Sequence, residues 1–221
     1  MNRGPVAEGE WYHCYNRGTD KRRIFNEERD YDRFLMLLYL ANSNVRLHVS
    51  DIGRGGQGPT LDRILEMERG DPLVAVGAYS LMPNHFHLLL RPAQPGGVAL
   101  FMQKVSTGYS MYFNKIHERT GTLFEGKFKS KHVSTDNYFR RLVNYIHANA
   151  AELYDPGWKQ GIIKNEKVLK KNLLAYRFSS LAEYQPRSTK SGIVDTSAVE
   201  ALLDKALSLD DLIEEARIFA E

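Results

Sequence analysis

The sequence predicts an α+β sandwich built on an antiparallel sheet. Strand-like and helix-like segments are interspersed along its 221 residues. The two central strand-like segments are separated only by Met82-Pro83-Asn84, a connection typical of an antiparallel hairpin. The helix-like segments are amphipathic, so each has an apolar face to place on a sheet. The length fits one domain of about 150 to 200 residues with appendages.

The first half of the chain begins with β-formers. Residues 11–16 (WYHCYN) stop at the turn signal Arg17-Gly18 and are expected to form a strand. Residues 26–42 carry apolar side chains at helical spacing, with Asn26 and Glu27 as expected capping residues. Residues 43–72 resemble an insertion that contains a short strand (45–52), a glycine-rich loop (53–58) and a short helix (60–68).

The second half supplies the remaining elements. We expect a hairpin of strands over 73–81 and 85–91, a long amphipathic helix over 97–117, a strand over 124–133 and a helix over 136–151. A linker at 186–192 is then followed by two short helices, over 197–207 and 209–220. We therefore divide the chain into a core domain over 1–185 and a small helical extension over 186–221.

Charge is distributed unevenly. The formal net charge of the chain is +3. Residues 190–221 contain three basic and eight acidic side chains, a net charge of −5, so the net charge of residues 1–189 is +8. An excess of this sign suits a polyanionic partner such as nucleic acid. Cys14 is the only cysteine, and no segment resembles a signal peptide or a membrane span. A cytoplasmic, membrane-free protein is expected.

The sharpest local feature is His85-Phe86-His87 in the segment HFHLLL. Because strand side chains alternate between faces, His85 and His87 project to one side and Phe86 to the other. Two imidazoles on one rigid face can bind a divalent metal ion. The alternative is that both histidines only decorate the surface of the sheet.

A third ligand is offered by the helix expected over 136–151. Residues four apart share a helical face, so Tyr145 and Asn149 point the same way. If this helix packs across the histidine face, Asn149 completes a His/His/amide site and places Tyr145 beside the metal. The alternative for Tyr145 is an ordinary buried helix tyrosine.

This set supports covalent catalysis at phosphorus. A phenol has a pKa near 10 and needs activation, which a nearby divalent cation supplies while it polarises the phosphodiester. Attack by Tyr145 would break a DNA strand and leave a phosphotyrosine. Because that linkage retains the transfer potential of the phosphodiester, a free hydroxyl could reverse the reaction and join strands without ATP.

Basic side chains provide the expected contacts with DNA. At period two, Lys127, Lys129 and Lys131 share one face of the expected strand, where they could follow a phosphate backbone or merely charge an edge strand. A second basic group, in the loop after the first strand, comprises Arg17, Lys21, Arg22 and Arg23.

One motif is set aside. Residues 53–58 (GRGGQG) match GxGxxG, but no convincing parallel βαβ unit follows them. We therefore expect a loop there and no nucleotide cofactor.

Four motifs in order resemble the single-tyrosine HUH transposases, including the REP-associated tyrosine transposase branch. They are YHCYNRG at 12–18, LMPNHFHLLL at 81–90, GTLFEGKFKSKHV at 121–133 and YFRRLVNYIHANA at 138–150. With FSSLAEY at 178–184, the resemblance spans about residues 10–185. Ala150 departs from the proline of many relatives, and the acidic tail beyond residue 186 has no clear role in the family.

The resemblance implies a ferredoxin-like HUH endonuclease core that acts on single-stranded DNA, often near a hairpin. It assigns His85, His87 and Asn149 to a Mg²⁺ or Mn²⁺ ion and Tyr145 to the nucleophile that forms a 5′-phosphotyrosine. It implies a cytoplasmic protein that joins the nucleoid when bound to DNA, either as a monomer or as a homodimer. The open alternatives are a replication-initiator or relaxase nickase and a regulator that binds hairpins without catalysis.

Overall fold

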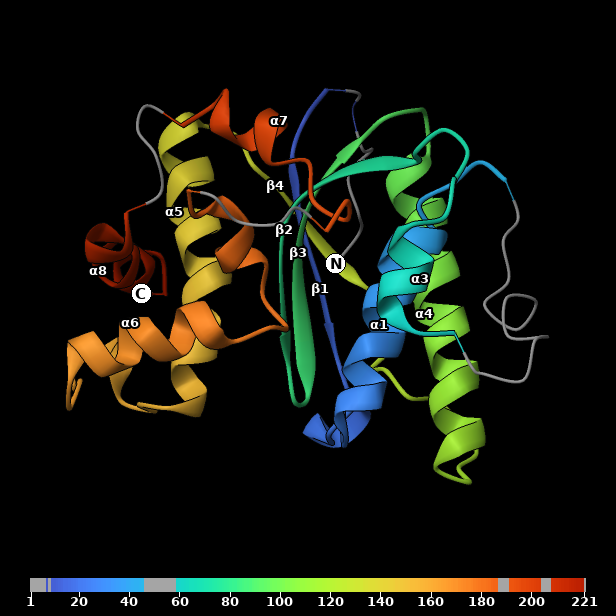
Figure 1. The fold of residues 1–221 in the computed structure, drawn as a ribbon, viewed down its shortest axis with the longest axis horizontal. Coiled ribbons are helices and arrows are strands. Elements are labelled where there is room, and N and C mark those ends of the chain that lie inside the picture. Colours follow the sequence, from blue (N-terminus) through green and yellow to red (C-terminus); the bar gives the residue numbers. More distant parts are fainter. Residues whose placement is uncertain (1–6, 8, 46–58, 187–190, 204–207, 221) are drawn as a thin grey trace.

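A four-stranded antiparallel sheet forms the centre of the molecule (Figure 1). The computed structural model describes residues 7, 9–45, 59–186, 191–203 and 208–220. The strands are β1 (Tyr12–Arg17), β2 (Val74–Met82), β3 (His85–Pro92) and β4 (Lys129–His132), in the order β2-β3-β1-β4. This arrangement confirms the α+β expectation.

The connections give the sheet its ferredoxin-like topology. Strand β3 lies between β1 and β2 and is antiparallel to both, so β1 and β2 run parallel to each other. Helix α1 (Glu28–Leu40) connects β1 to β2, and helix α4 (Gly97–Ile116) connects β3 to β4. Two split βαβ units of this kind define the fold. The histidine strand β3 is therefore an inner strand with a neighbour on each side.

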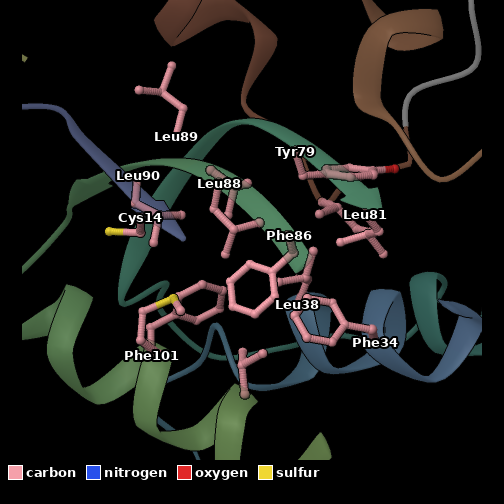
Figure 2. Packing of buried hydrophobic residues seen from close by; sticks show 14 of the residues in the cluster. Cys14, Phe34, Leu38, Tyr79, Leu81, Phe86, Leu88, Leu89, Leu90 and Phe101 are labelled. Atoms are coloured by element: carbon pink, nitrogen blue, oxygen red, sulfur yellow. The ribbon is translucent and has the colours of Figure 1, made fainter. Parts of the chain in front are cut away.

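One face of the sheet is covered by α1, α4 and the short helix α3 (Leu61–Leu65) (Figure 1). Helix α1 starts with a capping box, in which the side chains of Glu27 and Asp30 each accept from the other's backbone N–H. Phe34 of α1 lies fully buried against Phe86 of β3, with ring centroids 5.0 Å apart. Figure 2 shows Phe34 and Phe86 in this core, with Leu88 and Leu90 of β3 above α4.

The opposite face carries the remaining helices (Figure 1). Helix α5 (Asp136–Ala148) packs on β2 and β3, and its first turn is capped by Thr135, whose side chain accepts from the N–H of Tyr138. Helix α8 (Leu209–Ala220) packs on α5, and α7 (Thr196–Glu200) packs on β2. The other elements are α6 (Glu166–Ala175) and 3₁₀ turns at Thr19–Lys21, Asn149–Leu153, Trp158–Gln160 and Ser180–Tyr184.

Several predicted boundaries were wrong. The strand expected over 124–133 begins only at Lys129, because Gly126 has a φ of 121° and Phe124 forms an isolated bridge to Gly18. The helix expected over 136–151 ends at Ala148 and tightens into a 3₁₀ turn. The helix expected over 197–207 ends at Glu200, and the one expected over 60–68 ends at Leu65. Residues 46–58 of the predicted insertion, including the GRGGQG loop, and residues 204–207 lie outside the described residues.

None of the described helices combines the length and the apolar character that crossing a bilayer requires.

Candidate active site

The candidate site is built around the two histidines of the HFH segment. His85 and His87 lie on β3, on the face opposite the buried Phe86, and their ring centroids are 5.1 Å apart. His85 is half-buried, and its Nδ1 lies 2.6 Å from Oδ1 of Asn84. His87 is only 8% exposed. Because β3 is paired along both edges, the spacing of these two imidazoles is fixed by the sheet.

The tyrosine helix crosses this same face. The ring of Tyr145 lies 5.7 Å from that of His87, centroid to centroid, at an interplanar angle of 80°. Asn149 is the last residue capping α5, and its Nδ2 donates to the backbone carbonyl of Tyr145 at 2.6 Å. The structure thus places His85, His87 and Tyr145 one after the other at the site, and Asn149 joins them through its hydrogen bond to the Tyr145 backbone.

A third histidine completes the group. His13 of β1 is 6% exposed, and its Nε2 lies 2.8 Å from Nδ1 of His87. Its ring stacks on His87 and lies 6.4 Å from that of Tyr145. His13 is absent from the predicted set of site residues. Its period-two spacing to Tyr15, whose ring lies 4.9 Å away, was the available signal.

The imidazoles are neutral at physiological pH. Burial lowers the pKa of His85 to about 4, with Lys159 and Arg17 adding to the effect and Glu152 opposing it. Burial also lowers the pKa of His87 well below 6.5, and that of His13 to about 3 with help from Lys131. A neutral imidazole keeps a nitrogen lone pair, which metal binding requires.

The phenol of Tyr145 is protonated in this environment. Burial raises its pKa, while the Lys159 ammonium and the hydrogen-bonded Asn149 side chain act in the opposite direction. Lys159 Nζ lies 2.9 Å from Oε2 of Glu152, so an ion pair from the segment after α5 borders the site. The phenol therefore needs an activating group before it can act as a nucleophile.

The donor set suits a divalent cation. Within the described ranges, no three His, Cys, Asp or Glu side chains are grouped to hold an ion. The candidate ligands are instead the two neutral imidazoles and the Asn149 carboxamide. Because that amide donates through Nδ2, its oxygen remains available as a ligand. The two imidazole nitrogens are donors typical of transition-metal ions, whereas the amide oxygen is a donor that Mg²⁺ and Mn²⁺ prefer, so this mixed set fits Mn²⁺ better than Mg²⁺.

Three of the predicted DNA-binding residues surround this face. Strand register places Arg17 opposite His85, and Lys129 opposite Tyr15, which itself lies opposite His87. Lys21 joins them from the 3₁₀ turn after β1, and these three side chains line a cavity of about 410 Å³ beside His85.

The other predicted DNA-binding residues lie elsewhere. Lys131 sits over the ring of Tyr138, with its Nζ 5.0 Å from the ring centroid. Arg22 donates to the Asp20 carboxylate, and Arg23 is exposed. Lys127 precedes β4, so the predicted row of three lysines on one strand is reduced to Lys129 and Lys131.

Part of the chain is similar to known transposases. Residues 60–149 match the family model described as "Transposase IS200 like". Over this segment the chain is similar to the IS200-like transposases. It is also similar, at 13% identity and a TM-score of 0.48, to a solved structure titled "Structure of the REP associates tyrosine transposase bound to a REP hairpin". That alignment covers 90% of this chain and 94% of the other. No curated protein matches the sequence.

Proposed function

We propose that this chain is a metal-dependent endonuclease and strand transferase for single-stranded DNA, with Tyr145 as its nucleophile. The observation that supports this proposal best is the position of the Tyr145 ring 5.7 Å from His87. A phenol on a helix and a pair of neutral imidazoles on an inner strand meet there. The family match gives transposition as the context for this chemistry.

His85, His87 and Asn149 would hold the Mg²⁺ or Mn²⁺ ion. When bound, the ion supplies charge that favours the phenolate and offsets negative charge on the phosphodiester. The protein positions the ligands and the phenol. The sheet fixes the imidazoles, and the hydrogen bond from Asn149 to the Tyr145 carbonyl ties the amide to the nucleophile's own helix.

The chemical step is an in-line exchange at phosphorus. The phenol of Tyr145 loses its proton, and its oxygen forms a bond to the phosphorus of the scissile phosphodiester. The bond from phosphorus to the 3′-oxygen breaks, and that oxygen leaves as a hydroxyl after protonation. A 5′-phosphotyrosine remains, and attack by a 3′-hydroxyl of another strand restores a phosphodiester and releases Tyr145.

The substrate is proposed to be a single strand, with a hairpin as the recognised feature. Helix α5 packs on β2 and β3, and Lys129 on β4 is exposed. A flexible strand can lie along β1 and β4 with its phosphates near Arg17 and Lys129. One subunit or a pair of subunits that share sites could perform the reaction.

The test is covalent adduct formation. Labelled single strands that flank a hairpin are incubated with protein and Mn²⁺, and the adduct is resolved by denaturing electrophoresis. Wild-type protein should form the adduct and Tyr145→Phe should not. Tyr138→Phe is the matched control, because it lies on the same helix and its buried hydroxyl has no hydrogen-bond partner among the described residues.

Two outcomes would contradict the proposal. An adduct formed by Tyr145→Phe would remove the assigned nucleophile. Hairpin binding by wild-type protein without product in any divalent ion would instead identify a regulator that binds DNA without cleaving it.

A further inference from the structure

The cavity beside His85 has a composition that differs from the rest of the site. Its volume is about 410 Å³, within the range of pockets that hold small ligands. Its lining includes the basic side chains Arg17, Lys21 and Lys129 together with Tyr15 and Asn84. The bond-making step assigned above to Tyr145 and the metal ligands uses none of these groups, and Arg17 and Lys129 enter the proposed function only as general phosphate contacts.

We propose that this cavity binds one nucleotide of the DNA strand beside the cleavage site, with its phosphate held by Lys21 and Lys129. The inference rests on the proposed function, because His85 is both a lining residue and a candidate metal ligand. It adds a defined subsite to that function and assigns two lysines to it.

The charges in the cavity are only partly compensated. Arg17 is paired with Glu125, with 2.5 Å between Nε and Oε1. Lys21 and Lys129 are exposed, and neither ammonium group has an ion-pair partner in the described part of the chain. Two unpaired cations beside one cavity favour a doubly contacted anion, and phosphate is the anion that a DNA strand presents.

The turn that carries Lys21 is conformationally strained. Asp20 and Lys21 have φ values of 56° and 57°, in the left-handed region that side chains other than glycine rarely adopt. A Cβ atom at Gly18 would lie 2.3 Å from the carbonyl oxygen of Arg22, so the turn also requires glycine there. Strain of this kind is typical of functional sites, where surrounding contacts maintain it.

Those contacts connect the turn to the histidine strand. The N–H of Gly18 donates to the Asn84 carbonyl at 2.9 Å, and Asn84 Nδ2 donates to the Lys21 carbonyl at 3.3 Å. Asn84 immediately precedes His85 and also bonds its ring. The same residue therefore positions Lys21 and orients a candidate metal ligand, which keeps the cavity and the reaction centre in a fixed relation.

The side-chain amides that line the cavity already form hydrogen bonds within the protein. Asn84 bonds Lys21 and His85, while Asn16 donates to the Gly126 carbonyl and accepts from the N–H of Arg17. Few free groups remain to read the edge of a base. The subsite should therefore hold the phosphate firmly, place the base near the ring of Tyr15 and show little preference for base identity.

The experiment measures binding without metal or cleavage. Fluorescence anisotropy follows a fluorescein-labelled oligothymidylate of about twelve nucleotides in EDTA over a series of salt concentrations. Lys21→Gln and Lys129→Gln should each reduce the slope of log affinity against log salt, and the double variant should reduce it by about 0.7, the value for one neutralised phosphate on a single strand. Lys167→Gln on α6, also an exposed lysine, is the matched control and should leave the slope unchanged.

A second variant separates function from conformation. Lys21→Gly removes the charge and relieves the left-handed strain, so it should raise the melting temperature while it lowers the salt slope. A raised melting temperature with an unchanged slope would show that Lys21 only shapes the turn, and would overturn its assignment.

The adduct assay distinguishes the two proposals. Unchanged slopes in both lysine variants, with an adduct formed by wild-type protein, would overturn the subsite and leave the proposed function standing. Lower slopes without any wild-type adduct would support the phosphate contacts and overturn the function. Lower slopes together with a wild-type adduct support both.

Discussion

Nε2 of His13 and Nδ1 of His87 lie 2.8 Å apart, in a buried contact between neighbouring strands. When His13 accepts the hydrogen bond, the Nδ1 of His87 carries the proton and its Nε2 keeps a lone pair. Hydrogen-bond partners of this kind fix the tautomer and orientation of histidines that bind metals. His13 is therefore a positioning residue in the proposed centre, although it is not one of its ligands.

Replacing His13 should weaken metal binding. His13→Leu removes the acceptor, and its affinity for Mn²⁺ should fall by roughly 10- to 100-fold in isothermal titration calorimetry. His13→Gln should retain much of the affinity because its side-chain oxygen can accept the same bond. His132→Gln, on the neighbouring strand and exposed, is the control. Equal affinities for His13→Leu and wild-type protein would show that the contact serves packing alone.

Asn149 should contribute an oxygen ligand to the cation and should lower the pKa of Tyr145. Asn149→Ala removes a candidate oxygen ligand and should lower Mn²⁺ affinity roughly tenfold or more, whereas Asn149→Asp retains an oxygen and should bind the ion. Because the Asn149 side chain lowers the pKa of Tyr145, the alanine variant should also shift the titration of that phenol upward. Ultraviolet difference titration measures this shift.

Asn137→Ala on the same helix is exposed and controls for the loss of an amide. If Asn149→Ala bound Mn²⁺ as tightly as the control, Asn149 would be a helix-end residue with no part in the metal site.

Stability should fall in acid through buried histidines outside the proposed chemistry. Burial lowers the pKa of His147 to about 3, and its Nε2 lies 2.9 Å from Oγ of Ser180. The unfolded chain, with a histidine pKa near 6.5, binds more protons between these values. The stability that neutral His147 contributes is therefore complete above about pH 6.5 and is lost as pH falls toward 3.

Urea denaturation at about pH 6 and about pH 5 measures this effect. His147→Gln cannot take up that proton, so the loss of unfolding free energy between the two pH values should be smaller by about 1 kcal/mol than in wild-type protein. Identical losses would mean that His147 takes up its proton equally in the folded and unfolded states.

The tail helix should stabilise the surroundings of Tyr145. The ring of Phe219 on α8 lies 4.7 Å from Tyr145 and 5.2 Å from Tyr138, centroid to centroid. Phe219→Ala should lower the free energy of unfolding by about 1 to 2 kcal/mol, through lost burial and lost aromatic contact. Ile218→Ala is the control because Ile218 is 47% exposed. Equal effects of the two substitutions in urea denaturation would contradict a specific contact with Tyr145.

Much of the fold could be predicted from local patterns. Alternation in HFHLLL assigned opposite faces to His85 and Phe86, and the helical spacing of Tyr145 and Asn149 assigned them one face. Strand length at β4 was overestimated because the bend at Gly126 depends on contacts with β1 rather than on alternation.

Other features depend on tertiary pairing. His13 meets His87 only through the register between β1 and β3, which are far apart in sequence. The left-handed turn at Asp20 and Lys21 contains no glycine at those positions, so propensity gives no sign of it. The contact of α8 with α5 is likewise a packing result, since the acidic tail alone favoured no particular partner.

The inner location of β3 has a dynamic consequence. Backbone amides that are bonded in the interior of a sheet exchange with solvent only when a large part of the structure opens. The two imidazoles should therefore keep their spacing through fluctuations that loosen α5, a helix attached to the sheet by side chains. Deuterium uptake should be slower in residues 85–92 than in 136–148, and β3 should be the more persistent half of the proposed centre.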